Sequence, residues 1–186
     1  MEKHVSDKWL FHGTSRENKK RIMEEKRFLH SNREDDWAGT GIYFFLEENE
    51  KDAKRNAKQW AGCIKRFPKH EIAILQVKII VDEEKILNLT LREFQNIFHK
   101  YREAIYRNAY DKAKSRRLTL EKTYTNKKLM DCFVINELCR FYGLQAVIRE
   151  AYINFNKYQY NEYPVSDIPN CTIFCLRDDS WIEEMK

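Results

Sequence analysis

The stretch Gly39-Thr40-Gly41-Ile42-Tyr43-Phe44 decides the fold, because it predicts a strand that starts directly after a polar, acidic loop over residues 31–40. Upstream, the apolar run over residues 9–12 predicts an earlier strand, which stops at Gly13. Between these strands, the capping box Thr14-Ser15-Arg16-Glu17 predicts a helix with Thr14 as its N-cap. The first part of the chain therefore has the order strand, helix, loop, strand.

The rest of the chain mixes helices and strands without strict alternation. Asn49 predicts the N-cap of a helix over residues 50–63, and Thr90 with Glu93 forms a second capping box before an amphipathic helical pattern that reaches Ala109. A further helix is expected over residues 129–142, closing on Gly143. Strands are expected over residues 72–81, 145–150, 160–165 and 172–176. Such an arrangement is typical of an α+β fold with a mixed or antiparallel sheet.

Composition excludes several classes of protein. The 186 residues suit a single domain, and 42% hydrophobic residues against 34% charged ones exclude a disordered tail or a fibrous repeat. No run approaches the ~18 uncharged apolar residues of a membrane helix, and the first residues lack the apolar core of a secretory signal. We therefore expect no membrane segment and a cytoplasmic location. The five cysteines contain no C-x-x-C pair, which predicts reduced thiols and no metal site.

Positive charge is concentrated in one part of the sequence. Residues 100–128 contain ten Lys and Arg against three acidic residues, a net charge of +7, whereas the remainder carries −2. Such a segment can neutralise phosphates, and its neighbouring aromatic residues can stack on bases. It can equally be the solvated face of a helix. The residues named for nucleic-acid binding are Lys112, Lys114, Arg116 and Arg117.

Three short motifs together resemble a known family. They are Phe11-His12-Gly13-Thr14, the Gly39-to-Phe44 stretch, and Asn161-Glu162-Tyr163 near the C-terminus. In this order and in these strand contexts they resemble the H-Y-E signature of the poly(ADP-ribose) polymerase-like branch of the ADP-ribosyltransferase fold. The resemblance implies a mostly antiparallel, split sheet with a cleft for NAD. Residues 82–128 lie outside it, and we interpret them as a helical insertion in a single domain over residues 1–186.

The resemblance also implies a role for each motif residue. His12 would hydrogen-bond the 2′-hydroxyl of the NAD ribose, and the Gly13 backbone would pair with the nicotinamide carboxamide. Tyr43 would stack on the nicotinamide ring. Glu162 would hydrogen-bond the same ribose, stabilise the oxocarbenium-like cation and orient or deprotonate the acceptor. NAD would then be a co-substrate, with no metal involved.

Three further residues are weaker candidates for contacts with NAD: Thr14, Arg33 and Trp60. Arg33 could pair with the pyrophosphate, and Trp60 is the nearest aromatic residue where relatives carry a second ring beside the nicotinamide. Each residue also has a structural interpretation: His12 as a bonded strand-end histidine, Tyr43 and Trp60 as core, Thr14 as a helix cap, Glu162 as an exposed carboxylate. Tyr160 stands where arginine-modifying members carry Gln or Glu, so modification of arginine is disfavoured.

The function that the resemblance implies is mono-ADP-ribosylation of a macromolecule. The basic segment favours RNA or DNA slightly over protein as the acceptor. A small transferase of this kind resembles toxins of toxin-antitoxin or phage-defence systems, which would imply an antitoxin partner. The alternatives are an NAD glycohydrolase, with water as acceptor, and a non-catalytic module that binds NAD or ADP-ribose.

Overall fold

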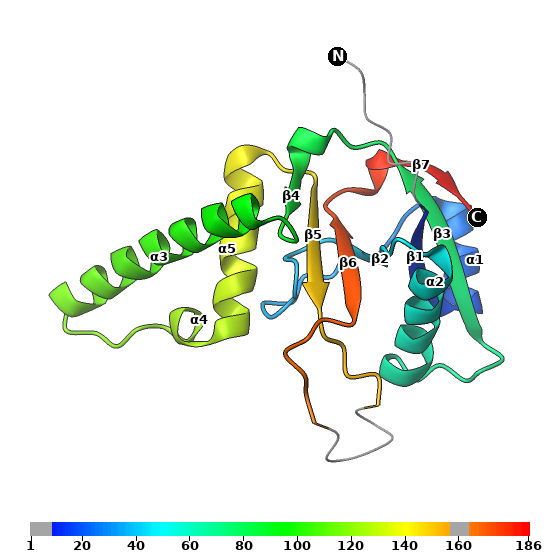
Figure 1. Ribbon diagram of the computed structural model, residues 1–186, viewed down its shortest axis with the longest axis horizontal. Helices are drawn as coiled ribbons and strands as arrows, with labels where there is room; N and C mark the ends of the chain where they lie inside the picture. Colours follow the sequence, from blue (N-terminus) through cyan, green and yellow to red (C-terminus); the bar gives the residue numbers. More distant parts are fainter. Residues whose placement is uncertain (1–8, 157–163) are drawn as a thin grey trace.

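The computed structural model describes residues 9–156 and 164–186, and in this part of the chain seven strands form one sheet in the order β4-β5-β6-β2-β1-β3-β7 (Figure 1). The strands are β1 (Leu10–Ser15), β2 (Ile42–Phe45), β3 (Ile72–Ile79), β4 (Ile86–Asn88), β5 (Ala146–Ala151), β6 (Cys171–Leu176) and β7 (Ile182–Met185). Strands β4 and β5 are parallel, and all the other neighbours are antiparallel. The expected α+β fold with a mixed, mostly antiparallel sheet is therefore confirmed.

Helices cover both faces of this sheet. They are α1 (Arg16–Glu25), α2 (Glu50–Gln59), α3 (Arg92–Ser115), α4 (Lys122–Thr125) and α5 (Lys127–Tyr142), with a π-helix over Trp60–Ile64 and 3₁₀ turns over Glu83–Lys85 and Asp179–Trp181. Alternate residues of β6 point to opposite faces. Phe174 and Leu176 lie in the core beneath α1, whereas Ile173 packs in the core beneath α2 and Cys175 in the core beneath α5. The helices α3, α4 and α5 lie at one end of the sheet and α1 and α2 at the other (Figure 1).

Two of the predicted helix caps were wrong. The N-cap of α1 is Ser15, not Thr14, and its hydroxyl accepts a hydrogen bond from the Asn18 N–H at 3.1 Å. The reason is that β1 pairs with β3 as far as Ser15, so Thr14 is a buried strand residue opposite Ala73. Thr90 caps no helix, because its hydroxyl donates to Asn88 Oδ1 at 2.6 Å instead. The predicted cap Asn49 is confirmed, since its side chain accepts from the Lys51 N–H.

Residues 82–128 are not an all-helical insertion. Residues Ile86–Asn88 form edge strand β4, which pairs in parallel with β5, so the segment belongs partly to the sheet. Beyond it, α3 runs away from the sheet and packs on α5 through Phe98 and its neighbours. Of the strand expected over residues 160–165, the described residues 164 and 165 have no regular structure. No helix of the described residues is long and apolar enough to span a membrane.

The junction between β1 and β2 is narrow. Strand β1 pairs with β3 over its whole length but with β2 through the pair Phe11↔Phe45. One residue further along β1, the connection to β2 is a side-chain hydrogen bond from His12 to the Tyr43 carbonyl. The two halves of the sheet thus meet at the predicted motif residues.

Candidate functional site

A small cavity of about 40 Å³ lies where β1 and β2 separate. Its lining includes four residues that the family resemblance assigned to NAD: His12 and Gly13 of one motif, Tyr43 of another, and Trp60, which lies outside the motifs. The other lining residues are apolar or aromatic: Trp37, Phe44, Phe45, Ile153 and Ile173. The structure therefore brings four of the seven residues predicted to contact NAD into one aromatic cavity.

His12 is held in one tautomer. Its Nδ1 lies 2.8 Å from the Tyr43 carbonyl oxygen, which can only accept, so Nδ1 carries the proton and Nε2 is an acceptor. The ring makes edge contacts with Phe28 and Phe44, with centroids 5.5 and 5.8 Å apart. This burial lowers the pKa of His12 below its ordinary value, and Lys65 lowers it further, against the raising effect of the hydrogen bond. The imidazole is therefore neutral at pH 7.

Tyr43 is fixed by two hydrogen bonds at its hydroxyl. The hydroxyl donates to the Gly39 carbonyl at 2.6 Å and accepts from the Ala38 N–H at 2.9 Å. Burial raises the pKa of Tyr43 above its ordinary value, so the hydroxyl stays protonated. The two bonds thus hold the turn before β2 in place, and Tyr43 lines the cavity.

Gly13 allows α2 to lie directly on β1. A Cβ atom at this position would overlap the backbone carbonyl of Ala57. The residue is thus required for helix packing, whether or not its backbone also contacts a ligand. The close approach places Asn56 and Trp60, four residues apart on one face of the helical run, beside the sheet.

Trp60 and Trp37 form one wall of the cavity. Their rings meet edge to face with centroids 5.9 Å apart, and Trp60 also contacts Phe45 at 6.5 Å. Trp60 starts the π-helix, a local widening of the helix that is frequent at functional sites. Trp60, which the resemblance named as a candidate second ring beside the nicotinamide, thus lines the cavity, and so does Trp37, which was not named as a site residue.

A partly buried ionic network supports the loop that carries Trp37. Arg149 of β5 donates from Nη1 to the Trp37 carbonyl at 2.7 Å, and its Nη2 lies 3.4 Å from Asp131 of α5. The same carboxylate accepts from Arg102 of α3 at 3.0 Å. No local pattern in the sequence predicts this network, because its members are far apart along the chain.

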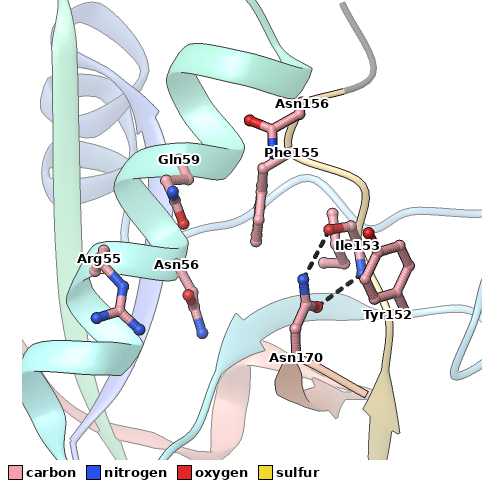
Figure 2. Close-up of a pocket in the computed structure, with 8 residues that line it drawn as sticks. All are labelled: Arg55, Asn56, Gln59, Tyr152, Ile153, Phe155, Asn156 and Asn170. Atoms are coloured by element: carbon pink, nitrogen blue, oxygen red, sulfur yellow. Dashed lines mark hydrogen bonds between the residues drawn. The ribbon is translucent and has the colours of Figure 1, made fainter. Parts of the chain in front are cut away.

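A second, larger cavity of about 290 Å³ adjoins the first, and Ile153 lines both. Figure 2 shows Asn56 and Gln59 projecting from α2 toward the segment after β5 that carries Phe155. Asn170 closes another side. The remaining lining residues are Arg55, Tyr152 and Asn156.

Two side-chain amides beside this cavity are fixed in place. Asn170 donates from Nδ2 to the Ile153 carbonyl at 3.0 Å and accepts from the Ile153 N–H at 2.9 Å, as the dashed lines in Figure 2 show. Asn56 donates to Glu47 Oε1 at 3.0 Å, and the same oxygen accepts from the Thr172 N–H at 2.9 Å. Burial raises the pKa of Glu47, against the lowering effect of these bonds. The cavity is therefore shaped by hydrogen bonds rather than by packing alone.

Several predicted residues lie elsewhere. Thr14 and Arg33 line neither cavity; Thr14 is buried in β1, and Arg33 makes a two-point contact with Asp35 at 3.1 and 3.2 Å. The four basic residues Lys112, Lys114, Arg116 and Arg117 are exposed at the C-terminal end of α3. Glu162 lies outside the described residues. Within residues 9–156 and 164–186, no cluster of three or more His, Cys, Asp or Glu could hold a metal ion.

Comparisons with known proteins give little further information. No protein family matches the chain, and no solved structure matches it. An uncharacterized protein of Methanocaldococcus jannaschii is 34% identical over 96 residues. The match spans 48% of this chain and 40% of the archaeal protein. This chain is thus similar to part of a longer protein whose printed name assigns no activity.

Proposed function

We propose that this protein is a mono-ADP-ribosyltransferase that cleaves NAD and transfers ADP-ribose to a macromolecular acceptor. The observation that carries the proposal is the gathering of His12, Gly13, Tyr43 and Trp60 around one cavity. The family resemblance implies contacts with NAD for each of them, although Tyr43 and Trp60 lie far from His12 and Gly13 in the sequence. The coincidence supports a common site for the nicotinamide end of NAD.

The chemistry of the lining suits that substrate. Cleavage of the bond between nicotinamide and ribose creates an oxocarbenium-like sugar, so the site must hold the ring flat and fix the ribose hydroxyls. The neutral His12 offers Nε2 as an acceptor for a ribose hydroxyl. Tyr43 and Trp60 offer rings for the nicotinamide. Glu162 keeps the sequence-based role of stabilising the cation and orienting the acceptor.

The cavity is too small to hold a nicotinamide ring without a local change of structure. At about 40 Å³ it has room for little more than one water molecule of ~30 Å³, and a nicotinamide ring is several times larger. Trp60 and Trp37 must therefore move apart when the ring enters. Because tryptophan emission responds to such contacts, titration with nicotinamide should quench the fluorescence, and Trp60→Phe should reduce the quenching.

The basic segment and the family resemblance bear on the acceptor and the biological role. The net charge of residues 100–128 favours RNA or DNA, since exposed Lys and Arg at the end of α3 can contact phosphates. Action as a toxin of a toxin-antitoxin or phage-defence system, with an antitoxin partner, follows from the family resemblance alone.

The test is incubation of the wild-type protein and Glu162→Ala with radiolabelled NAD and a whole-cell extract. Samples are then treated with nuclease or with protease. Label that vanishes with nuclease, survives protease and is absent for the variant is the expected result. Label removed by protease would move the acceptor to protein.

Two outcomes would refute the proposed transferase activity. Release of nicotinamide without any labelled macromolecule would establish an NAD glycohydrolase. Intact NAD, together with measurable binding of NAD or ADP-ribose, would establish a non-catalytic binding module.

A further inference from the structure

We infer that the larger cavity receives one unstacked nucleobase of a single-stranded nucleic acid, the acceptor of the transferred group. The inference rests on the proposed function for the transfer step, and on the lining of the cavity for the base. It goes beyond the basic helix, which could contact phosphates but would not select a base.

The position of the cavity suits an acceptor. It adjoins the smaller cavity, with Ile153 as a shared wall. Residues of one helical run serve both: Asn56 and Gln59 line the larger cavity, and Trp60 lines the smaller one. With nicotinamide in the smaller cavity, a group in the larger one lies next to the reacting sugar.

The chemistry of the lining suits a neutral heterocycle. Among the described residues, amides dominate the lining: Asn56, Gln59, Asn156 and Asn170. The amides of Gln59 and Asn156 can present a donor and an acceptor side by side, as the edge of a base does, whereas the Asn170 amide is already bonded to the Ile153 backbone at both ends. Phe155 and Tyr152 add aromatic rings, on which a base can stack. A volume of about 290 Å³ lies at the small end of the range for ligand pockets.

The charges disfavour a cationic acceptor. None of the described lining residues is acidic, so the side chain of an arginine or lysine acceptor would find no carboxylate partner there. The single cation, Arg55, is paired with Asp52 at 2.7 Å, which leaves the cavity close to neutral. A neutral base is therefore a better match than a charged side chain.

The site is also organised before any ligand binds. The bond from Asn56 to Glu47 fixes the orientation of the amide, and its Oδ1 remains able to accept a hydrogen bond. The two bonds between Asn170 and Ile153 fix the segment that carries Phe155. Groups held in this way lose little entropy when a ligand arrives.

The transfer step balances without another reactant. A lone pair on an amino or ring nitrogen of the base forms a bond to C1′ of the ribose. The bond from C1′ to nicotinamide breaks, and nicotinamide leaves as a neutral molecule with the electron pair. An amino or N–H nitrogen then releases its proton to solvent, whereas a ring nitrogen without a hydrogen keeps the positive charge that the nicotinamide group has lost.

The experiment uses short single-stranded homopolymers of each base, as DNA and as RNA, with an abasic strand as control. Three quantities are measured: binding of each strand without NAD, nicotinamide released, and ADP-ribose attached to the strand. We expect one base to bind and to be labelled in preference to the others. Phe155→Ala and Gln59→Ala should each lower strand affinity, and transfer per nicotinamide released, by about tenfold.

Two controls separate this result from damage to the fold. Phe155→Tyr keeps a stacking ring and should restore binding and transfer. Lys54→Ala changes an exposed residue on the opposite side of α2, about 200° around the helix from Asn56, and should bind and transfer like the wild-type protein.

The possible failures are distinguishable. Equal binding of abasic and intact strands, or affinities unchanged by Phe155→Ala and Gln59→Ala, would overturn the base pocket whatever happens to NAD. Label on proteins with none on any strand would overturn it as well. Base-dependent binding that the variants weaken, without any nicotinamide release, would refute the transferase and leave the base pocket standing.

Discussion

The Nδ1 atom of His12 lies 2.8 Å from the carbonyl oxygen of Tyr43, and this bond joins β1 to β2 just beyond their backbone pairing. It also decides which ring nitrogen can act as an acceptor in the cavity. The sheet junction and the state of the candidate site residue therefore depend on one contact. Substitutions around this contact should affect stability and ligand binding together.

His12 should make stability depend on pH below its ordinary pKa of 6.5. Burial lowers its pKa in the folded protein, so as pH falls below 6.5 the unfolded chain binds a proton that the folded chain does not. Above pH 6.5 both forms are neutral and His12 contributes no pH dependence. For each pH unit below 6.5, the free energy of unfolding should therefore decrease in the wild-type protein by up to about 1.4 kcal/mol more than in His12→Gln. Urea unfolding across this pH range measures the difference, and parallel curves for the two proteins would contradict it.

Tyr43→Phe should loosen the turn that carries Trp37. The change leaves the Ala38 N–H and the Gly39 carbonyl without their partner, and Ala38 is fully buried. We expect a loss of about 1–3 kcal/mol in the free energy of unfolding. Amide hydrogen exchange at Ala38 should accelerate. Tyr106→Phe, on the exposed surface of α3, is the matched control and should change neither quantity.

Gly13→Ala should destabilise the packing of α2 on β1. The new Cβ would overlap the Ala57 backbone, which cannot rotate away, so the helix must shift. Overpacking of this kind costs about 1–3 kcal/mol. In Gly62→Ala, by contrast, the new Cβ meets only the flexible end of Ile72, at 3.1 Å. Thermal unfolding should show a clear loss for the first variant and little for the second; equal losses would refute the argument.

Asp131→Asn should weaken the link between α3, α5 and the Trp37 loop. The carboxylate is largely buried and serves both Arg102 and Arg149. Removing its charge leaves two guanidinium groups without an anionic partner, at a cost of about 1–3 kcal/mol because water partly screens both groups. Glu103→Gln breaks the exposed pair with Arg107 and should cost less than about 1 kcal/mol. Chemical denaturation compares the two, and a small loss for Asp131→Asn would show that the network is not a support.

Neutralising Lys112, Lys114, Arg116 and Arg117 together tests the basic end of α3. If these residues contact phosphates, affinity for single strands should become less sensitive to salt, by up to about 0.7 in the logarithmic slope for each charge. Four exposed basic residues of α1 and the segment after it serve as the control: Lys20, Arg21, Lys26 and Arg27. Equal effects of the two sets would show that only net charge matters.

Local sequence signals predicted most of the central elements. As expected, α2 begins at the N-cap Asn49 and α5 ends at Gly143, because a cap depends on residues close by in the chain. The apolar runs also marked β1, β2, β3, β5 and β6. By contrast, β4 and β7 were not predicted, since both are short edge strands whose pairing depends on distant partners. The choice of Ser15 over Thr14 as a cap depended on β3 in the same way.

Only part of the candidate site could be predicted, namely the residues that the family resemblance implied. His12, Gly13, Tyr43 and Trp60 were named from the sequence, and they meet at one cavity. Asn56, Gln59, Phe155 and Asn170 carry no motif, and the fold alone brings them together. Arg33 was assigned from its loop position, but its neighbour Asp35 engages its guanidinium.

The central place of β6 in the sheet has a consequence for biosynthesis. This strand covers Cys171–Leu176, close to the C-terminal end, yet it pairs with both β2 and β5 and supplies Ile173 to the smaller cavity. Contacts between residues so far apart in sequence form slowly and late. A ribosome must therefore have added residues 171–176 before the sheet around either cavity is complete, so a nascent chain that lacks them is unable to bind a ligand at this site.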